Sequence, residues 1–198
     1  TDKSSGIPEG YFVRAVREDP DRKGLLYAGT EFGMFISFDD GKHWQKFQLN
    51  LPITPITDML VFKKDLVVST QGRAFWILDD ISLLHQLKKD QAGKNVFLFK
   101  PENTYRTQVR GTLSRLSVYF YLGEKPGKPD SVKVEILDRE DKVIYKFDKV
   151  KAEKGFNNLN WNLTYKAPEK IKEAVLSLSY YRGPKAVPGT YKVRLTKG

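Results

Sequence analysis

Two pairs of adjacent aspartates are the residues of this sequence best suited to acid–base chemistry. Asp39 and Asp40 close one apolar run, and Asp79 and Asp80 close another. Glycoside hydrolysis needs two carboxyl groups roughly 5 to 10 Å apart across a cleft. Successive residues of a strand point to opposite faces of the sheet, so neither pair suits a shared substrate. We therefore expect no catalytic residue in this chain.

The first pair belongs to the stretch SFDDGKHW, residues 37–44. An Asp-Gly step between two β-rich runs is a signal for a tight hairpin turn. Asp39 can accept hydrogen bonds from the N–H groups of its own turn, and Gly41 can adopt a positive φ at little steric cost. Trp44 can cover the edge of the hairpin. Together with Ser37, these residues predict a turn that stabilises the fold and does no chemistry.

Composition excludes several other kinds of site. The chain has no cysteine, which excludes disulfides and thiolate metal sites. His43 and His85 are its only histidines, too few for a histidine-rich metal site. Neither a G-x-x-x-x-G-K-[ST] phosphate loop nor a G-x-S-x-G nucleophile turn is present. We expect no metal and no cofactor.

A repeat of forty residues organises the first half. Residues 26–40, LYAGTEFGMFISFDD, align without a gap on residues 66–80, LVVSTQGRAFWILDD. A period near forty with several short strands in each unit is typical of the blades of a β-propeller. The predicted strands are 12–16, 24–30, 33–38 and 44–49 in the first unit, and 56–62, 65–70 and 74–78 in the second.

The second repeat departs from the first after Asp80. The stretch ISLLHQLKK, from Ile81, lacks the Gly and Trp of the first unit and is typical of a short helix. The second unit therefore lacks its own fourth strand. Strand 74–78 would expose an unpaired apolar edge, and such edges invite pairing with another segment. We expect an N-terminal strand of a longer protein, the strand VFLF at 96–99, or a neighbouring chain to cover it.

The Ser37, Asp39, Gly41 and Trp44 pattern resembles the Asp-box of bacterial neuraminidase repeats, with His43 where Thr is usual. Residues 7–88 as a whole resemble the last blades of secreted sortilin-like or BNR-repeat propeller proteins grouped as "glycosyl hydrolases". This resemblance implies that the chain is the C-terminal part of a larger secreted propeller protein, with a structural Asp-box. It supplies no match to a catalytic residue of true glycosidases.

Propeller geometry places the ligand on the face opposite the Asp-box turn. The Asp-box turn joins the third and fourth strands of a blade, whereas the loops between second and third strands open on the other face. Those loops read TEFG at 30–33 and TQGR at 70–73. Arg73 could form paired hydrogen bonds with a carboxylate, and Glu31 could accept from hydroxyls. The candidate ligand-binding residues are therefore Glu31, Gln71 and Arg73; pairing with neighbouring blades is the alternative role.

The second half has the pattern of a β-sandwich. Alternating strands at 115–122, 131–138, 142–147, 157–163 and 189–195 are separated by turn signals. The segments VEILDREDKVI, NLNWNL and VPGTYKVRL resemble the Ig-like domain of the flagellar hook-capping protein. The resemblance implies a spacer or docking module, with Trp161 and Tyr191 in its core.

Charge is unevenly distributed between the halves. Residues 1–100 carry 14 Lys/Arg and 13 Asp/Glu, whereas residues 101–198 carry 20 and 11. Nucleic-acid binding is one interpretation of a basic half. The lysines are mixed with acids, however, which favours a solvated surface, and we expect no nucleic-acid partner. No apolar run has the roughly 18 residues of a membrane span.

The sequence thus predicts an all-β chain: propeller blades at 1–92, a linker at 93–104 and an Ig-like sandwich at 105–198. Its expected function is non-catalytic, as the ligand-binding or scaffold part of a secreted, periplasmic or cell-surface bacterial protein. The ligand would be a glycan or a peptide, and the partner the missing N-terminal propeller part or a second copy. The alternative is a polysaccharide-active glycoside hydrolase whose catalytic residues lie in absent N-terminal blades.

Overall fold

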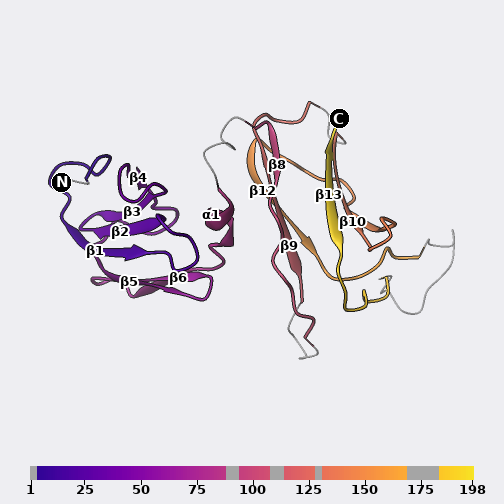
Figure 1. Ribbon diagram of the computed structural model, residues 1–198, viewed down its shortest axis with the longest axis horizontal. Helices are drawn as coiled ribbons and strands as arrows, with labels where there is room; N and C mark the ends of the chain where they lie inside the picture. Colours follow the sequence, from indigo (N-terminus) through magenta and orange to yellow (C-terminus); the bar gives the residue numbers. More distant parts are fainter. Residues whose placement is uncertain (1–3, 88–93, 108–113, 128–130, 169–182) are drawn as a thin grey trace. The chain divides into compact units, whose positions relative to one another are not determined.

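The computed structural model describes residues 4–87, 94–107, 114–127, 131–168 and 183–198. In these residues nearly all regular structure is β, in antiparallel sheets, so the predicted all-β class is confirmed (Figure 1). The chain divides into two compact units, Thr1–Leu87 and Lys88–Gly198. Each unit has its own hydrophobic core.

The first unit consists of two antiparallel sheets and one short helix. A four-stranded sheet has the order β1 (Val13–Glu18), β2 (Leu26–Thr30), β3 (Gly33–Ser37) and β4 (Gln45–Lys46). A three-stranded sheet has the order β5 (Ile56–Phe62), β6 (Asp65–Thr70) and β7 (Phe75–Leu78). Helix α1 (Ser82–Gln86) follows β7 where the predicted helix begins.

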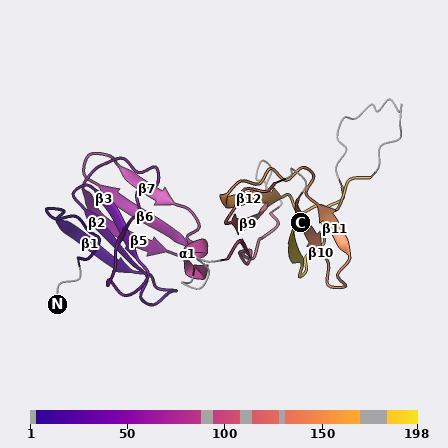
Figure 2. The same ribbon diagram turned by 90° about the horizontal axis from the view of Figure 1, so that it is seen from above.

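The two sheets pack face to face because each has a buried apolar side. The shared core includes Tyr27 and Ile36 from the first sheet and Ile56 and Leu66 from the second. The two layers can be followed in Figures 1 and 2. Gly29 allows the closest approach, since a Cβ there would lie 2.5 Å from the Ile56 side chain. The forty-residue repeat therefore produces two similar sheets that stack on each other.

The outer faces of the two sheets differ. On the first sheet, Phe35 and Trp44 are buried, with Ile7 and Tyr11 packed against them from the N-terminal segment. On the second sheet the outer face is open and apolar. Its exposed large apolar side chains are Leu60 at 58%, Phe62 at 57%, Phe75 at 76% and Ile77 at 60%.

The second unit contains two three-stranded sheets around one core. One has the order β12 (Gly155–Trp161), β9 (Leu116–Leu122), β8 (Val96–Leu98); the other has β11 (Val143–Lys146), β10 (Val132–Leu137), β13 (Lys192–Lys197). Phe120 and Trp161 from the first sheet and Val134 and Ile136 from the second belong to one buried cluster. The two sheets therefore cover opposite sides of the same core.

Strand β8 corrects two sequence-based expectations. Residues 96–98 lie in the predicted linker 93–104, but they pair with β9 and belong to the second unit. The same pairing means that VFLF does not cover the edge of β7, because its backbone is matched to β9. In the described part of the chain, β7 pairs with β6 alone. The boundary between the units falls between residues 87 and 88, ahead of the predicted linker.

Candidate functional site

The Asp39 turn, at residues 37–44, is closed by its own polar groups. Ser37 Oγ donates a hydrogen bond to Asp39 Oδ1 at 3.0 Å and accepts one from the Gly41 N–H, also at 3.0 Å. The backbone N–H of His43 donates to Asp39 Oδ1 at 2.9 Å, and His43 Nδ1 lies 2.7 Å from Asp39 Oδ2. Asp40 and Gly41 have φ of 62° and 74°, so the turn uses two consecutive left-handed residues. Both Asp39 oxygens therefore bind groups of the same turn.

The hydrogen bonds of the turn stabilise the charged form of Asp39. The bond with the His43 side chain, aided by the His43 N–H and the Ser37 hydroxyl, lowers the pKa of Asp39 far below its usual range. Such a carboxylate is a poor general acid, because it does not hold a proton near neutral pH. The arrangement suits a structural anion.

Trp44 connects this turn to the N-terminal segment. Its backbone N–H donates to the Ser5 carbonyl at 2.8 Å, and its side chain packs on Phe35. Gly6 lies so close that a Cβ would be 2.0 Å from the Trp44 carbonyl oxygen, and its φ is 98°. Side chain and backbone of Trp44 thus hold residues 4–11 over the first sheet.

Asp80, in the second acidic pair, is also engaged in a turn. The Asp80 N–H donates to Asp65 Oδ1 at 3.0 Å, and Asp80 Oδ1 accepts from the Ser82 N–H at 3.2 Å at the start of α1. Asp79 is exposed. None of these contacts pairs two carboxylates across a cleft, as glycoside hydrolysis would require.

The candidate ligand residues lie at the other end of the stacked sheets. Gly29, near the end of β2, contacts Ile56, and Ile56 pairs with Thr70 at the end of β6. The loops that follow Thr30 and Thr70 therefore lie at the same end of the two stacked sheets. Glu31 lies in the first loop, and Gln71 and Arg73 lie in the second.

These three residues differ in what surrounds them. Glu31 accepts a hydrogen bond from Arg14 Nε at 2.7 Å, so part of its carboxylate serves a neighbour in the same sheet. Gln71 and Arg73 are exposed. Their loop is held through backbone atoms, because the Gln71 N–H donates to the Pro55 carbonyl and the Trp76 indole donates to the Arg73 carbonyl. The exposed side chains of the second loop thus project from a fixed backbone.

A buried polar cluster escaped prediction from the sequence. Asp19, 2% exposed, follows β1 directly. Its Oδ2 accepts from the Tyr27 hydroxyl at 3.0 Å and lies 2.9 Å from His85 Nε2 on α1. Its Oδ1 accepts the N–H groups of Asp21 and Arg22. Arg22 also donates to the Leu84 carbonyl. The cluster fastens α1 to the turn between β1 and β2.

Opposing effects set the protonation of this cluster. Burial opposes charge on Asp19, but the hydrogen bonds from His85, the Asp21 N–H and Tyr27 outweigh it and lower the pKa of Asp19. Burial and the nearby Asp19 raise the pKa of Tyr27 well above its usual value. Asp19 is therefore a buried anion that four donor groups satisfy. No local motif announces it, since Asp19 and His85 are 66 residues apart.

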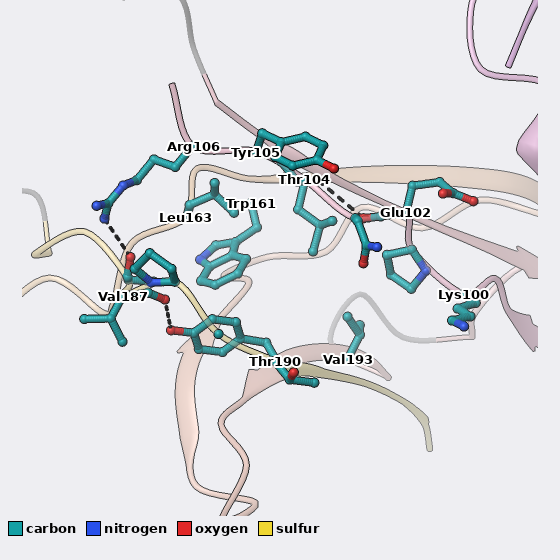
Figure 3. A pocket seen from close by; sticks show the side chains of 17 residues that line it. Lys100, Glu102, Thr104, Tyr105, Arg106, Trp161, Leu163, Val187, Thr190 and Val193 are labelled. Carbon is teal, nitrogen blue, oxygen red and sulfur yellow. Dashed lines mark hydrogen bonds between the residues drawn. The ribbon is translucent and has the colours of Figure 1, made fainter. Parts of the chain in front are cut away.

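The second unit has a pocket of about 610 Å³ at one end of its core (Figure 3). Its walls come from the segment 100–106, the segment 186–191, and residues of β9, β12 and β13. Figure 3 shows the Trp161 indole among the lining side chains, with Tyr105 and Arg106 above it in this view. Trp161 is satisfied internally, because Nε1 donates to the Thr164 carbonyl at 2.8 Å.

Hydrogen bonds to the backbone fix the rim of this pocket. Arg106 Nη1 donates to the Ala186 carbonyl at 3.0 Å, and the Tyr191 hydroxyl donates to the Val187 carbonyl at 2.6 Å. The Trp161 and Tyr191 rings meet edge to face, 5.4 Å apart. The predicted core positions of Trp161 and Tyr191 thus also line a cavity. Its aromatic walls suit an apolar group better than an ion.

The described residues hold no cluster of His, Cys, Asp and Glu side chains able to bind a metal. No helix among them is long and apolar enough to cross a membrane. No family model, no curated protein and no solved structure matches this chain. Its function must therefore be argued from the geometry above.

Proposed function

We propose that this chain is the non-catalytic C-terminal part of a secreted or cell-surface β-propeller protein of bacterial type. It binds a glycan or peptide ligand or acts as a scaffold. The observation that carries the proposal is the internal use of Asp39. Both oxygens of its carboxylate accept hydrogen bonds within the turn, so Asp39, the central residue of the turn motif, has a structural role.

The arrangement of the first unit supports the propeller part of the proposal. Its two antiparallel sheets follow the chain in order and stack face to face, with β1 and β5 bridged by the Arg17–Asp58 ion pair. Blades of a propeller pack in this manner. For the second unit, two small antiparallel sheets around one core support an Ig-like module.

The end of the stacked sheets that carries Glu31, Gln71 and Arg73 is the proposed ligand position. Arg73 and Gln71 are exposed on a loop whose backbone is held in place, which favours binding because little ordering is needed. Arg14 beside Glu31 adds a second guanidinium to this edge. A ligand with hydroxyl and carboxylate groups would match these side chains.

The open outer face of the second sheet supports the proposed partner. The edge strand β7 carries Phe75 and Ile77, both largely exposed. A further sheet, from the N-terminal propeller part or from a second copy, would cover these side chains as the first sheet covers the opposite face.

Binding of the chain to a glycan array and a peptide array tests the proposal. Arg73→Ala should weaken binding to a hit that carries a carboxylate group by roughly 5- to 100-fold, the loss expected for a charged hydrogen bond. Asp39→Ala is the matched control at the opposite end of the stacked sheets, and the folded variant should bind normally. Binding lost in Asp39→Ala at an unchanged melting temperature would contradict the proposal. Release of reducing sugar from a bound glycan would favour the glycoside hydrolase alternative.

A further inference from the structure

The outer face of the β12–β9–β8 sheet has an unusual composition. None of the residues within these three strands is charged, although 29% of the chain is Asp, Glu, Lys or Arg. Their inward side chains, among them Val118 and Phe120, are buried in the core. The outward side chains are aromatic, amide or hydroxyl groups. This face therefore suits a partner without charge.

Three aromatic rings form a row across the strands. Phe97 pairs with Tyr121, and Tyr121 pairs with Phe156, so the three side chains lie side by side on the outer face. The Tyr121 and Phe156 ring centroids are 5.4 Å apart. With neighbouring strands about 4.8 Å apart, the row spans about 10 Å. Phe156 is 58% exposed, at one end of the row.

A fourth ring holds this row in place. Phe99 is buried at 1% exposure and stacks on Phe156 at 5.7 Å, with the ring planes 27° apart. It also meets the edge of Phe97 at 4.8 Å. The exposed Phe156 ring is thus in contact with two other rings, stacked on Phe99 and edge to face with Tyr121. Such a ring loses little conformational freedom when a ligand stacks on it.

Polar side chains continue the same face beyond the aromatic row. Asn158 lies opposite Tyr119, and Asn160 lies opposite Ser117. Ser117 Oγ donates to Asn160 Oδ1 at 3.1 Å, which fixes the orientation of that amide. Each Asn amide presents both donors and an acceptor. Aromatic rings, the Asn158 amide and the oriented Asn160 amide therefore share one face of the sheet.

We propose that this face binds a neutral oligosaccharide chain. A pyranose ring has an apolar C–H face that stacks on an aromatic ring and hydroxyl groups that exchange hydrogen bonds with amides. The absence of charge on the three strands disfavours polyanions and polycations relative to a neutral ligand. An extended peptide would instead add to a strand edge, where backbone groups are open. The proposal concerns the second unit and does not rest on the proposed function of the first.

Native affinity electrophoresis of the whole chain tests this inference. Separate gels contain hydroxyethyl cellulose, laminarin or galactomannan, and a gel with alginate reports charge-driven retention of this basic chain. We expect retardation by at least one of the neutral polymers. Phe156→Ala should weaken the apparent affinity about tenfold through the lost ring contact, and Asn158→Ala should weaken it several-fold.

Two further variants separate the possible causes. Phe156→Tyr keeps the ring and should keep the binding. Lys192→Ala on β13, in the other sheet of the second unit, should bind like the original chain. If Phe156→Ala fails to fold, Asn158→Ala, whose side chain is exposed, carries the test. No retardation in any neutral gel, or equal retardation of Phe156→Ala, would overturn the proposal. Loss of self-association in Phe156→Ala without any polysaccharide effect would instead assign this face to a protein contact.

Discussion

In the first repeat, the chain continues from β3 through the Asp39 turn into β4, whereas in the second it leaves the sheet after Asp80 and forms α1. The two repeats share aligned β-strands up to that point. The first repeat therefore closes its outer edge with its own residues. The second leaves β7 as an edge and an apolar face open. One strand pattern thus supports two endings, which depend on the residues that follow the second aspartate.

A different set of polar contacts stabilises the end of each repeat. The Asp39 turn is local, because the hydrogen bonds among Ser37, Asp39, Gly41 and His43 join residues two to four positions apart. The Asp19 cluster is long-range and joins the turn between β1 and β2 to α1 after the second repeat. The first set closes a hairpin, whereas the second fixes one repeat to the other. Their loss should therefore have effects of different size.

Asp19→Ala should produce the largest effect. It removes the acceptor of the Tyr27 hydroxyl and of His85, and it leaves the Asp21 and Arg22 N–H groups without their partner. Loss of one member of a buried charged network costs about 3–5 kcal/mol of unfolding free energy. Urea denaturation measures this loss. Asp21→Ala is the control, since its side chain is exposed. An equal effect of the two substitutions would mean that the cluster does not hold the repeats together.

Asp39→Ala should have a smaller effect. The turn loses two hydrogen bonds from His43 and one from Ser37, but the site is close to solvent. By analogy with loss of a helix cap, the cost is about 0.5–2 kcal/mol. Thermal unfolding of Asp39→Ala and of Asp79→Ala, an exposed aspartate of the second repeat, gives the comparison. A loss as large as that of Asp19→Ala would contradict the distinction between a local and a long-range set of contacts.

The pH dependence of the unfolding free energy should report the contribution of the Asp39 carboxylate to the turn. Because the folded-state pKa of Asp39 lies below its unfolded value, the turn contributes stability above about pH 4. That contribution is lost as the pH falls through the folded-state pKa. The original chain should therefore lose more stability between pH 5 and pH 2 than Asp39→Ala does. Parallel acid limbs in the two unfolding profiles would show that the shift does not stabilise the turn.

Ile77→Lys should change the unfolding free energy least. Ile77 is 60% exposed on the open face of β7, so its replacement removes few contacts, within about 0.5 kcal/mol. A lysine on an edge strand opposes pairing with another chain. Sedimentation velocity should therefore show less self-association than in the original chain. Unchanged sedimentation with a large loss of stability would mean that this face is not an open one.

The sequence predicts strands well where local pattern determines them. Strands 56–62 and 65–70 agree with β5 and β6 at both ends. The fourth strand was predicted at 44–49 and is only Gln45–Lys46. The reason is a side chain: Gln48 Oε1 accepts the Met34 N–H, and Leu49 then takes a positive φ of 45°. A side chain that replaces a backbone partner leaves no trace in strand periodicity.

The candidate sites follow the same rule. The Asp39 turn is recognisable because its partners lie within a few residues of each other. The Asp19 cluster and the Trp161 pocket join segments that are far apart in sequence, so no local motif marks them. The Phe97–Tyr121–Phe156 row depends on the pairing of three strands and becomes visible only once their register is known.

The Asp19 contact also constrains the order in which a nascent chain can fold. The first sheet can form as soon as residues 13–46 have been synthesised, but His85 follows Asp19 by 66 residues. Until then the Asp19 carboxylate lacks its contact with His85, one of four donor groups, which makes its early burial unfavourable. Closing so long a loop is slow compared with forming a hairpin. The first sheet should therefore stay loosely packed around Asp19 until α1 leaves the ribosome. The contact between His85 and Asp19 then forms and fixes the two repeats to each other.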